Sequence, residues 1–132
     1  MPRSGTYARH VDVVRAELAD DPTVDITTIG RRTGAPRRIE IWVVDVDGRF
    51  FITGTEGRRD WLANLKENPS LIVHLERHAD VDLPARATLV EDVVTRRHVL
   101  EHANAAWYLG QQSLDALVDA APMVELHFES AT

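Results

Sequence analysis

The alternation of hydrophobic and polar residues along the chain predicts a mixture of helices and strands. Residues 7–19 space Val11, Val14 and Leu18 at helical intervals, whereas residues 24–29 alternate as in a strand with one buried face. Proline, or an asparagine followed by proline, marks the ends of several segments, because proline cannot continue a helix. We expect helices over residues 7–19, 58–67, 92–106 and 111–120, and strands over residues 24–29, 39–46, 49–53, 70–76, 85–91 and 123–128.

The order of these elements favours an antiparallel sheet or a small barrel over a doubly wound parallel sheet. The middle strands follow one another as hairpins, without the long crossovers that parallel strands need. Asp47 and Gly48 lie between two runs of β-branched and aromatic residues, which is a strong hairpin signal. Residues 77–84 are polar and predict a turn. The chain has 132 residues, without repeats or linkers, so we expect a single domain of class α+β over residues 1–132.

Composition excludes several classes of function. The chain has no cysteine, which rules out disulfides, thiolate nucleophiles and zinc–thiolate sites. Its formal net charge of −6 argues against a general nucleic-acid-binding protein. No apolar stretch approaches the ~18 residues that a membrane span needs, and the N-terminal segment contains no signal-peptide core. A cytoplasmic location is therefore expected.

Positive charge is nevertheless concentrated within residues 27–54, where four arginines fall between Arg31 and Arg38. The same turn contains two glycines, which let backbone N–H groups approach an anion, and arginine adds bidentate donors suited to phosphate. Thr33 can add a hydroxyl donor. The lysine and spacing of a Walker A loop are missing. A solvated hairpin rim with ion pairs is the alternative, and since Lys66 is the only lysine, a high arginine content alone is weak evidence.

Other candidate residues are fewer. His98 and His102 lie four residues apart on an expected helix with Glu101 between them, but no third metal ligand is evident, so we expect no metal site. No serine lies in a nucleophile elbow, and no carboxylate pair has a glycosidase-like setting, so no catalytic residue is assigned. Trp107 and Tyr108 are adjacent on a helix and cannot both face inward, so one of them is expected to line a pocket.

Two short motifs, with a closing apolar run, give the chain a family resemblance. Gly-Arg-x-Thr-Gly-x-x-Arg spans residues 30–37, Trp-x-x-Asn-Leu-x-x-Asn-Pro spans residues 61–69, and the run Ala-Pro-Met-Val-Glu-Leu-His-Phe covers residues 121–128. Through these, residues 24–129 resemble the deazaflavin-dependent nitroreductase family. The resemblance implies a split β-barrel of mainly antiparallel strands with peripheral helices, related to the flavin-binding pyridoxamine-phosphate-oxidase-like proteins.

The resemblance also implies the cofactor F420, a deazaflavin with a phosphate and a polyanionic oligoglutamate tail. The implied reaction is hydride transfer from the reduced cofactor to a small hydrophobic acceptor of quinone or nitro type, with the chemistry supplied by the cofactor. The implied acceptor pocket contains Trp107 and Tyr108. The implied cofactor-binding residues are Arg32, Thr33, Gly34 and Arg37 at the phosphate, Ile39, Glu40 and Ile41 along the ring through their backbone, and Thr55, Trp61 and Asn64.

Departures from the family pattern leave alternatives open. Glu40 stands where the family often has proline, and Glu56 stands about where users of F420 often carry a basic residue, although Arg58 and Arg59 can compensate. FMN, whose tail ends at a single phosphate, is the alternative cofactor. A non-catalytic binder of a flavin-like, porphyrin or fatty-acyl ligand is the third interpretation. Split-barrel relatives often dimerise, so a homodimer is also open.

Overall fold

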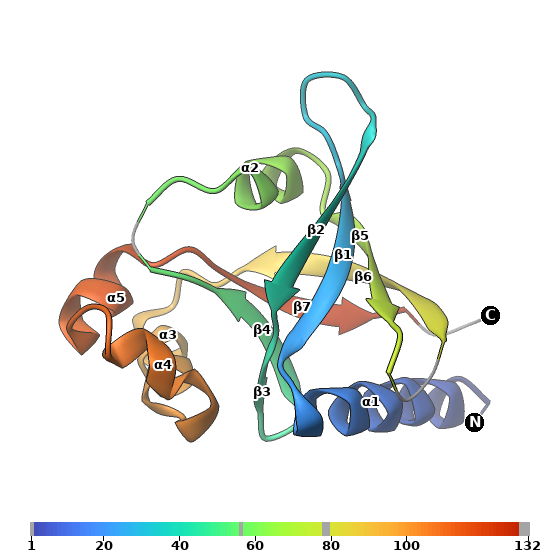
Figure 1. Ribbon diagram of the computed structural model, residues 1–132, viewed down its shortest axis with the longest axis horizontal. Coiled ribbons are helices and arrows are strands. Elements are labelled where there is room, and N and C mark those ends of the chain that lie inside the picture. Colours follow the sequence, from blue (N-terminus) through green and yellow to red (C-terminus); the bar gives the residue numbers. More distant parts are fainter. Residues whose placement is uncertain (1, 56, 78–79, 130–132) are drawn as a thin grey trace.

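The computed structural model describes residues 2–55, 57–77 and 80–129, with side chains from residue 10 onward (Figure 1). No helix among these residues combines the length and the apolar character needed to cross a bilayer. The helices are α1 (Pro2–Asp20), α2 (Asp60–Glu67), α3 (Val93–Glu101), the 3-10 helix η1 (Ala103–Ala105), α4 (Ala106–Leu109) and α5 (Leu114–Ala120). The strands are β1 (Thr23–Ile29), β2 (Pro36–Trp42), β3 (Val44–Val46), β4 (Arg49–Thr53), β5 (Ser70–Leu75), β6 (Val81–Leu89) and β7 (Met123–Phe128).

Within the described residues, seven strands form one sheet in the order β2-β1-β5-β6-β7-β4-β3, and every neighbouring pair is antiparallel. The sheet curls into an incomplete barrel whose two edges are β2 and β3 (Figure 1). Asp47 and Gly48 connect β3 to β4 with positive φ angles of 54° and 88°, as the favoured two-residue hairpin turn requires. The predicted antiparallel α+β fold is confirmed.

The inner face of the curled sheet encloses the main hydrophobic core. Burial alternates strictly along β1, so that Val24, Ile26 and Thr28 point inward. In Figure 1, α2 lies over the upper opening of the curl and α1 lies along the lower one. Trp61 of α2 and Val14 of α1 belong to the same buried cluster as the inward residues of the sheet. The two helices therefore close the barrel at opposite ends.

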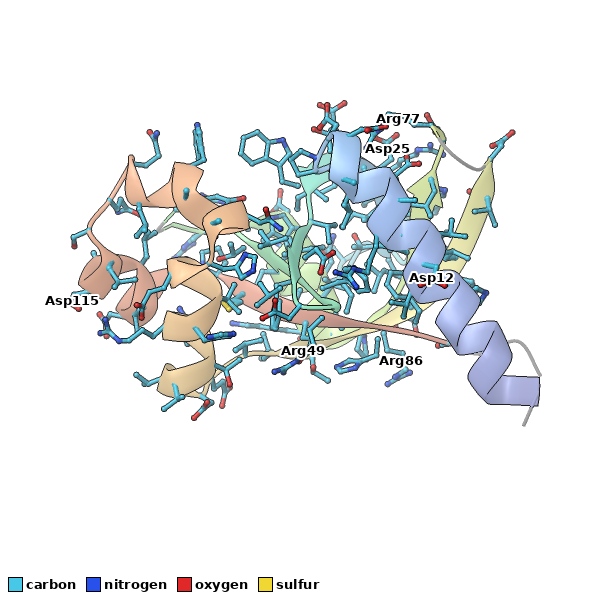
Figure 2. All side chains as sticks on the ribbon, turned by 90° about the horizontal axis from the view of Figure 1, so that it is seen from below. Asp12, Asp25, Arg49, Arg77, Arg86 and Asp115 are labelled. Carbon is cyan, nitrogen blue, oxygen red and sulfur yellow. The ribbon has the colours of Figure 1, made fainter. Side chains whose placement is uncertain are left out.

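A second hydrophobic core lies between the other face of the sheet and the C-terminal helices. Phe50 belongs to the inner core, whereas its neighbour Phe51 packs with Val99 of α3 and Leu117 of α5. Both faces of β4 are therefore covered, which explains why four of its five residues are buried and its pattern does not alternate. Seen from below in Figure 2, α5 with Asp115 lies at the opposite side of the molecule from α1.

The C-terminal helices are joined by a buried cation, Arg96 of α3, which is only 8% exposed. Its guanidinium donates to the backbone carbonyls of Val118 (2.7 Å), Val90 (2.9 Å), Leu117 (3.3 Å) and Ala121. Carbonyls in the last turn of a helix lack donors within that helix, and Arg96 supplies one to Val118, whereas the Leu117 carbonyl also accepts from the Ala121 N–H at 2.9 Å. Burial lowers the pKa of the Arg96 guanidinium below its ordinary value. Arg96 therefore fixes α5 against α3 and the end of β6.

One strand extends into a segment that the sequence predicts as a turn. β6 begins at Val81, so residues 81–84 pair with β5 instead of forming a loop. Pro84 is tolerated in the strand because it lies where pairing with β7 ends. There its carbonyl accepts a hydrogen bond from the Glu129 N–H at 3.1 Å. Within residues 81–84, Asp82 and Pro84 lie on the exposed face of the strand.

Among the other boundaries that differ from the prediction, two divide an element that was expected to be continuous. The run 39–46 is divided into β2 and β3 at Val43, whose N–H donates to the carbonyl of Pro22 (2.9 Å) as the chain passes from one sheet edge to the other. The helix expected to reach residue 106 ends at Glu101, because His102 has an extended backbone with ψ 144°. The first break is accompanied by the contact with Pro22, and beside the second the Asn104 side chain donates to the Asp45 carbonyl at 2.9 Å. Local propensity does not encode such contacts.

Candidate functional site

The turn between β1 and β2, residues 30–35, has a backbone that depends on glycine. The Gly30 N–H donates to the Ala35 carbonyl, and the Gly34 N–H donates to the Gly30 carbonyl, both at 2.8 Å. Gly34 has φ 75°, which other residues rarely adopt, and a Cβ at Gly30 would lie 3.1 Å from the Ala35 oxygen. Thr33 Oγ1 accepts from the Ala35 N–H at 3.2 Å, so its hydroxyl proton remains available to donate.

Asn64 of α2 is hydrogen-bonded to this turn. Its side chain is buried, and Oδ1 accepts from the Arg31 backbone N–H (3.1 Å) and from Arg31 Nη1 (3.0 Å). Its Nδ2 donates to Thr28 Oγ1 at 3.2 Å. An amide oxygen has two lone pairs, so Arg31 uses the whole acceptor capacity of Asn64. Asp60 at the start of α2 adds an ion pair with Arg31 Nη2 at 3.3 Å.

The four arginines of this segment divide into two pairs. Arg31 and Arg38 are each bound to carboxylates of the protein. By contrast, the guanidinium groups of Arg32 and Arg37 form no hydrogen bond or ion pair with any other residue in the described ranges. The alternative interpretation, a solvated rim with ion pairs, therefore applies only to Arg31 and Arg38. The unpaired half, Arg32 and Arg37, is free to bind an external anion.

Arg32 and Arg37 line the same pocket, which has a volume of about 310 Å³. Arg37 reaches it because alternation along β2 places its side chain on the same face as Ile39. The pocket brings together six of the predicted cofactor-binding residues: Arg32, Thr33, Arg37, Ile39, Trp61 and Asn64. The remaining lining residues, which the sequence reasoning did not assign, are Thr28, Gly30, Arg31 and Asp60. Thr28 could have been recognised in the sequence as a pocket residue, because it is a polar residue at an inward position of β1. No feature of the sequence points to Asp60.

The other predicted cofactor residues do not line this pocket: Gly34, Glu40, Ile41 and Thr55. Gly34 shapes the turn through its backbone, and Ile41 packs against the inner core. Glu40 lies on the opposite face of the sheet, because its side chain alternates with those of Ile39 and Ile41. The carboxylate that departs from the family pattern is thus directed away from the pocket.

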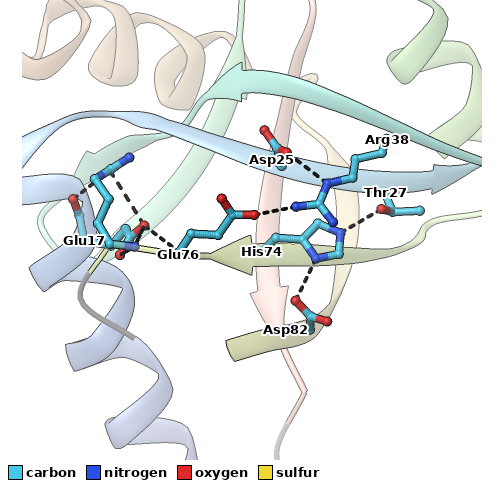
Figure 3. A network of polar contacts seen from close by, with 8 residues as sticks. Glu17, Asp25, Thr27, Arg38, His74, Glu76 and Asp82 are labelled. Atoms are coloured by element: carbon cyan, nitrogen blue, oxygen red, sulfur yellow. Dashed lines mark hydrogen bonds and ion pairs between the residues drawn. The ribbon is translucent and has the colours of Figure 1, made fainter. Parts of the chain in front are cut away.

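Glu40 instead lines a hollow of about 110 Å³ on the outer face of β1, β2 and β5. Arg38 spans this face, since its Nε donates to Asp25 at 2.9 Å and its Nη2 donates to Glu76 at 2.6 Å (Figure 3). The Asp25 hydrogen bond raises the pKa of the Arg38 guanidinium further above its ordinary value. Arg38 is therefore part of a cross-strand network and does not face the pocket.

His74 is buried within the same outer network. Its Nδ1 lies 2.7 Å from Asp82 Oδ1 and its Nε2 lies 2.7 Å from Thr27 Oγ1 (Figure 3). Both ring nitrogens are thus engaged by neighbouring strands. The strands are also tied to α1, because the buried carboxylate of Glu17 accepts from the backbone N–H groups of Glu76 (3.1 Å) and Arg77 (3.2 Å). These contacts stiffen the sheet behind the pocket.

A basic groove of about 580 Å³ continues from the pocket and shares Arg31, Arg32 and Asp60 with it. Its other lining residues are Gly57, Arg58, Arg59, Leu62, Ala63 and Lys66. Arg59 is partly committed within the loop, where its Nη2 donates to the carbonyl (2.9 Å) and hydroxyl (3.1 Å) of Thr55. Glu56, expected from the sequence to repel an anionic tail, lies outside the described residues.

An aromatic cluster lies at the far end of β2 from the turn. Trp42, the last residue of β2, packs edge-on against Trp107 at 5.2 Å and against Tyr108 at 6.2 Å between ring centroids. Trp107 is 53% exposed and Tyr108 is 5% exposed, so one ring faces outward and the other inward. That one of them lines an acceptor pocket stays a prediction. The Tyr108 hydroxyl donates to the Thr53 carbonyl at 3.5 Å, and burial raises the pKa of this phenol. Trp42 is a further aromatic residue that the sequence reasoning did not assign.

His98 of α3 and His102, which follows the last residue of α3, both lie near the carboxylate of Asp47. His98 Nε2 and His102 Nε2 lie 3.9 Å and 3.8 Å from the carboxylate of Asp47. His102 Nδ1 accepts from the Asn104 N–H at 3.1 Å, so in the neutral ring Nε2 carries the proton and cannot bind a metal. Nowhere in residues 2–55, 57–77 and 80–129 do three His, Cys, Asp or Glu side chains form a group that could hold a metal ion.

The chain matches a known protein family over most of its length. The family described as F420H(2)-dependent quinone reductase matches residues 4–115. The chain belongs to the F420H2-dependent quinone reductase family. The resemblance detected in the sequence is thereby confirmed, and F420 is the cofactor that the description of this family names.

Solved structures support the architecture of this quinone reductase family member. A candidate pyridoxamine 5′-phosphate oxidase from Listeria innocua has 14% identity and a TM-score of 0.65, covering 92% of this chain and 94% of that one. An F420-H2 dependent reductase has 21% identity and a TM-score of 0.57, with 81% and 95% coverage. A chain described as a domain-swapped dimer has 18% identity and a TM-score of 0.57, with 96% and 100% coverage. At these identities the likeness shows the fold, and the predicted split β-barrel is confirmed.

Proposed function

We propose that this protein binds F420H2 in the pocket beside the β1–β2 turn and reduces a small hydrophobic acceptor of quinone or nitro type. The observation that carries this proposal is that Arg32 and Arg37, whose guanidinium groups have no partner among the described residues, line one pocket. Together with the Thr33 hydroxyl they match the donors that a phosphate needs, and charge-assisted bonds of this kind are roughly twice as strong as neutral ones. The residues present therefore fit the phosphate of the cofactor.

The ring of the cofactor would lie along β2. This strand is an edge of the sheet, so part of its backbone N–H and C=O groups has no neighbouring strand to pair with. Ile39 lines the pocket, and Ile41 continues the apolar row along the same face of the strand. Glu40 contributes its backbone there while its carboxylate faces the other side of the sheet. Trp61, buried at the pocket wall, would exclude water from the phosphate end.

Bound F420H2 supplies the hydride, so the protein needs no triad or metal of its own. What the chain contributes is binding, orientation and exclusion of water. Trp107, whose ring is exposed, would receive the acceptor, because flat conjugated molecules stack well against aromatic rings, and the buried Tyr108 would support it from behind. β2 joins this cluster to the phosphate turn, with about 17 Å of extended strand between Arg37 and Trp42.

The continuation of the pocket into the basic groove favours F420 over FMN. FMN ends at its phosphate, whereas the F420 chain continues beyond it into an anionic tail. The groove begins at Arg31 and Arg32 and extends past Arg58 and Lys66, so positive charge lies where such a tail would emerge. A purely binding function is the less supported alternative, because the family described by the match is one of reductases. The homodimer and the cytoplasmic location stay predictions.

The proposal is tested by titrating the purified protein with F420 and with FMN, followed by steady-state oxidation of F420H2 with a naphthoquinone or a nitroaromatic acceptor. We expect micromolar affinity for F420, weaker binding of FMN, and turnover with at least one acceptor. The double variant Arg32→Ala/Arg37→Ala should bind F420 at least about tenfold more weakly, since two charge-assisted contacts are lost. No binding of F420 at tens of micromolar, or unchanged affinity in the double variant, would contradict the proposal.

A further inference from the structure

We propose that Asn64 and Arg31 form a positioning pair, which sets the conformation of the β1–β2 turn so that Arg32 and Arg37 reach the same pocket. This inference rests on the proposed function, because the affinity it controls is that for the cofactor phosphate. It gives Asn64 a role different from that of a ligand-binding residue. Neither Asn64 nor Arg31 needs to contact the phosphate for the pair to determine affinity.

The hydrogen bonds of Asn64 carry the first step of the argument. Its side chain is 4% exposed, and its Oδ1 accepts both from the backbone N–H of Arg31 and from the guanidinium of the same residue. One acceptor thus holds a residue at two points, which fixes the direction of the Arg31 side chain as well as its backbone. An anion gains nothing from this oxygen, because an anion needs donors.

The attachment of Asn64 to rigid elements carries the second step. Its Nδ2 donates to Thr28 of β1, and Asn64 itself lies on α2 between the core residues Trp61 and Leu65. The turn is therefore attached, through Asn64, to a strand and a helix that are both packed in the inner core. A site held by packed elements keeps its geometry better than one that depends on a loop alone.

The arrangement of the arginines carries the third step. Arg31 is turned toward α2, where Asp60 also binds it, while the next residue, Arg32, has no partner among the described residues. Arg37 approaches from the other arm of the hairpin and lines the same pocket. If the turn rotated as a whole, Arg32 and Arg37 would no longer converge. By fixing Arg31, the contacts with Asn64 and Asp60 keep the side chains of Arg32 and Arg37 at the same pocket.

The test is a double-mutant cycle of F420 affinity, measured by fluorescence titration of the full chain. We expect Asn64→Ala and Arg31→Ala each to weaken binding by about tenfold, and the double variant by about the same factor as the stronger single change, because the two residues act as one unit. Multiplication of the two effects, to about a hundredfold, would show independent contacts with the ligand and overturn the inference.

Matched controls separate positioning from general effects. Asn68→Ala also removes a hydrogen bond between an asparagine at the end of α2 and the backbone, here to the Ser70 N–H, but it does not touch the turn. Arg38→Ala removes the same charge as Arg31→Ala from the outer face of the sheet. Both controls should retain affinity within about twofold of the parent. If Arg38→Ala weakens binding as much as Arg31→Ala, the effect is one of net charge and the inference is wrong.

Amide hydrogen exchange of the cofactor-free protein gives a readout that does not depend on F420. The Arg31 amide should be protected in the parent chain and lose protection in Asn64→Ala, with exchange in β5 and β6 unchanged. An unprotected Arg31 amide in the parent would overturn the inference even if F420 binds normally. Failure of the parent to bind F420, with a protected Arg31 amide, would instead contradict only the proposed function. If Asn64→Ala does not fold, the comparison of Arg31→Ala with Arg38→Ala decides by itself.

Discussion

Arg37 and Glu40, three residues apart on β2, point to opposite faces of the sheet. Arg37 lines the pocket with Ile39, while Glu40 lines the hollow on the outer face near Asp25. The relationship follows from the period of two along a strand, which separates odd from even positions. The carboxylate that departs from the family pattern is therefore kept apart from the site it would otherwise disturb.

The first prediction compares these two residues directly. Arg37→Ala should weaken F420 binding by about tenfold or more, because a charge-assisted hydrogen bond to phosphate is lost. Glu40→Gln should change affinity by no more than about twofold, because its charge lies behind the sheet and is screened by solvent. Fluorescence titration at one ionic strength measures both. A large gain in affinity in Glu40→Gln would show that the carboxylate does repel the cofactor.

The second prediction concerns the buried guanidinium of Arg96. Arg96→Ala should lower the free energy of unfolding by about 3 kcal/mol, since several buried carbonyls lose their donors at once. Arg96→Lys should recover only part of this loss, because an ammonium group cannot reach four carbonyls spread around a planar fork. Chemical denaturation monitored by circular dichroism gives the values.

The neighbouring residue provides the control for that experiment. Arg97 forms an exposed ion pair with Asp115 at 3.0 Å. Arg97→Ala should cost less than about 0.5 kcal/mol, as expected for an exposed pair. Equal losses at Arg96 and Arg97 would mean that the carbonyl contacts of Arg96 do not hold the C-terminal helices together.

The third prediction is a pH dependence at the start of α3. The Thr95 hydroxyl and the Thr95 backbone N–H, which donate to Asp92, lower the pKa of this carboxyl below its ordinary value. Ionised Asp92 therefore stabilises the folded protein above about pH 4, and this stabilisation is lost as the pH falls through the lowered pKa. Asn can cap the helix without charge, so the denaturation midpoints of the parent and of Asp92→Asn should converge at low pH. A difference that stays constant down to about pH 2 would rule out the linkage.

The fourth prediction tests the basic groove. Arg58→Glu/Lys66→Glu should weaken binding of F420 severalfold and make the loss larger for longer tails, because each added carboxylate meets reversed charge. The same variant should bind a tail-free form of the cofactor almost as well as the parent. The comparison is made by titration at low and at moderate salt, and the difference should shrink as salt screens the charges. Equal losses for both forms would place the tail elsewhere.

The fifth prediction separates acceptor from cofactor binding. Trp107→Ala should raise the KM for a quinone acceptor by about three- to tenfold, which is the loss expected for an aromatic contact. F420 affinity should stay unchanged, because Trp107 is remote from the phosphate pocket along β2. Thermal stability should fall only slightly, since the ring is half-exposed. A change in F420 affinity without a change in KM would assign Trp107 to the cofactor instead.

By itself, the sequence determined the class of the fold, the cofactor family and most of the pocket. The alternation along residues 24–29, the Asp47–Gly48 turn and the glycines of the β1–β2 turn are local features with local physical causes. They were sufficient to predict an antiparallel sheet or small barrel, and the family resemblance proposed Arg32 and Arg37 as the phosphate-binding arginines. Among the boundaries predicted wrongly, the start of β6 is accompanied by pairing with β5, and the division of residues 39–46 by the contact between Val43 and Pro22.

Only the tertiary structure decided which arginines are free. Arg31 is held by Asn64 of α2, and Arg38 is held by Asp25 of β1 and by Glu76, which directly follows β5. These partners lie 33, 13 and 38 residues away in the chain, so no local pattern reveals them. The face on which Glu40 lies depends likewise on the register of β2 against β1. A side chain is available to a ligand only when the packed fold has given it no other partner, and that is a property of the whole sheet.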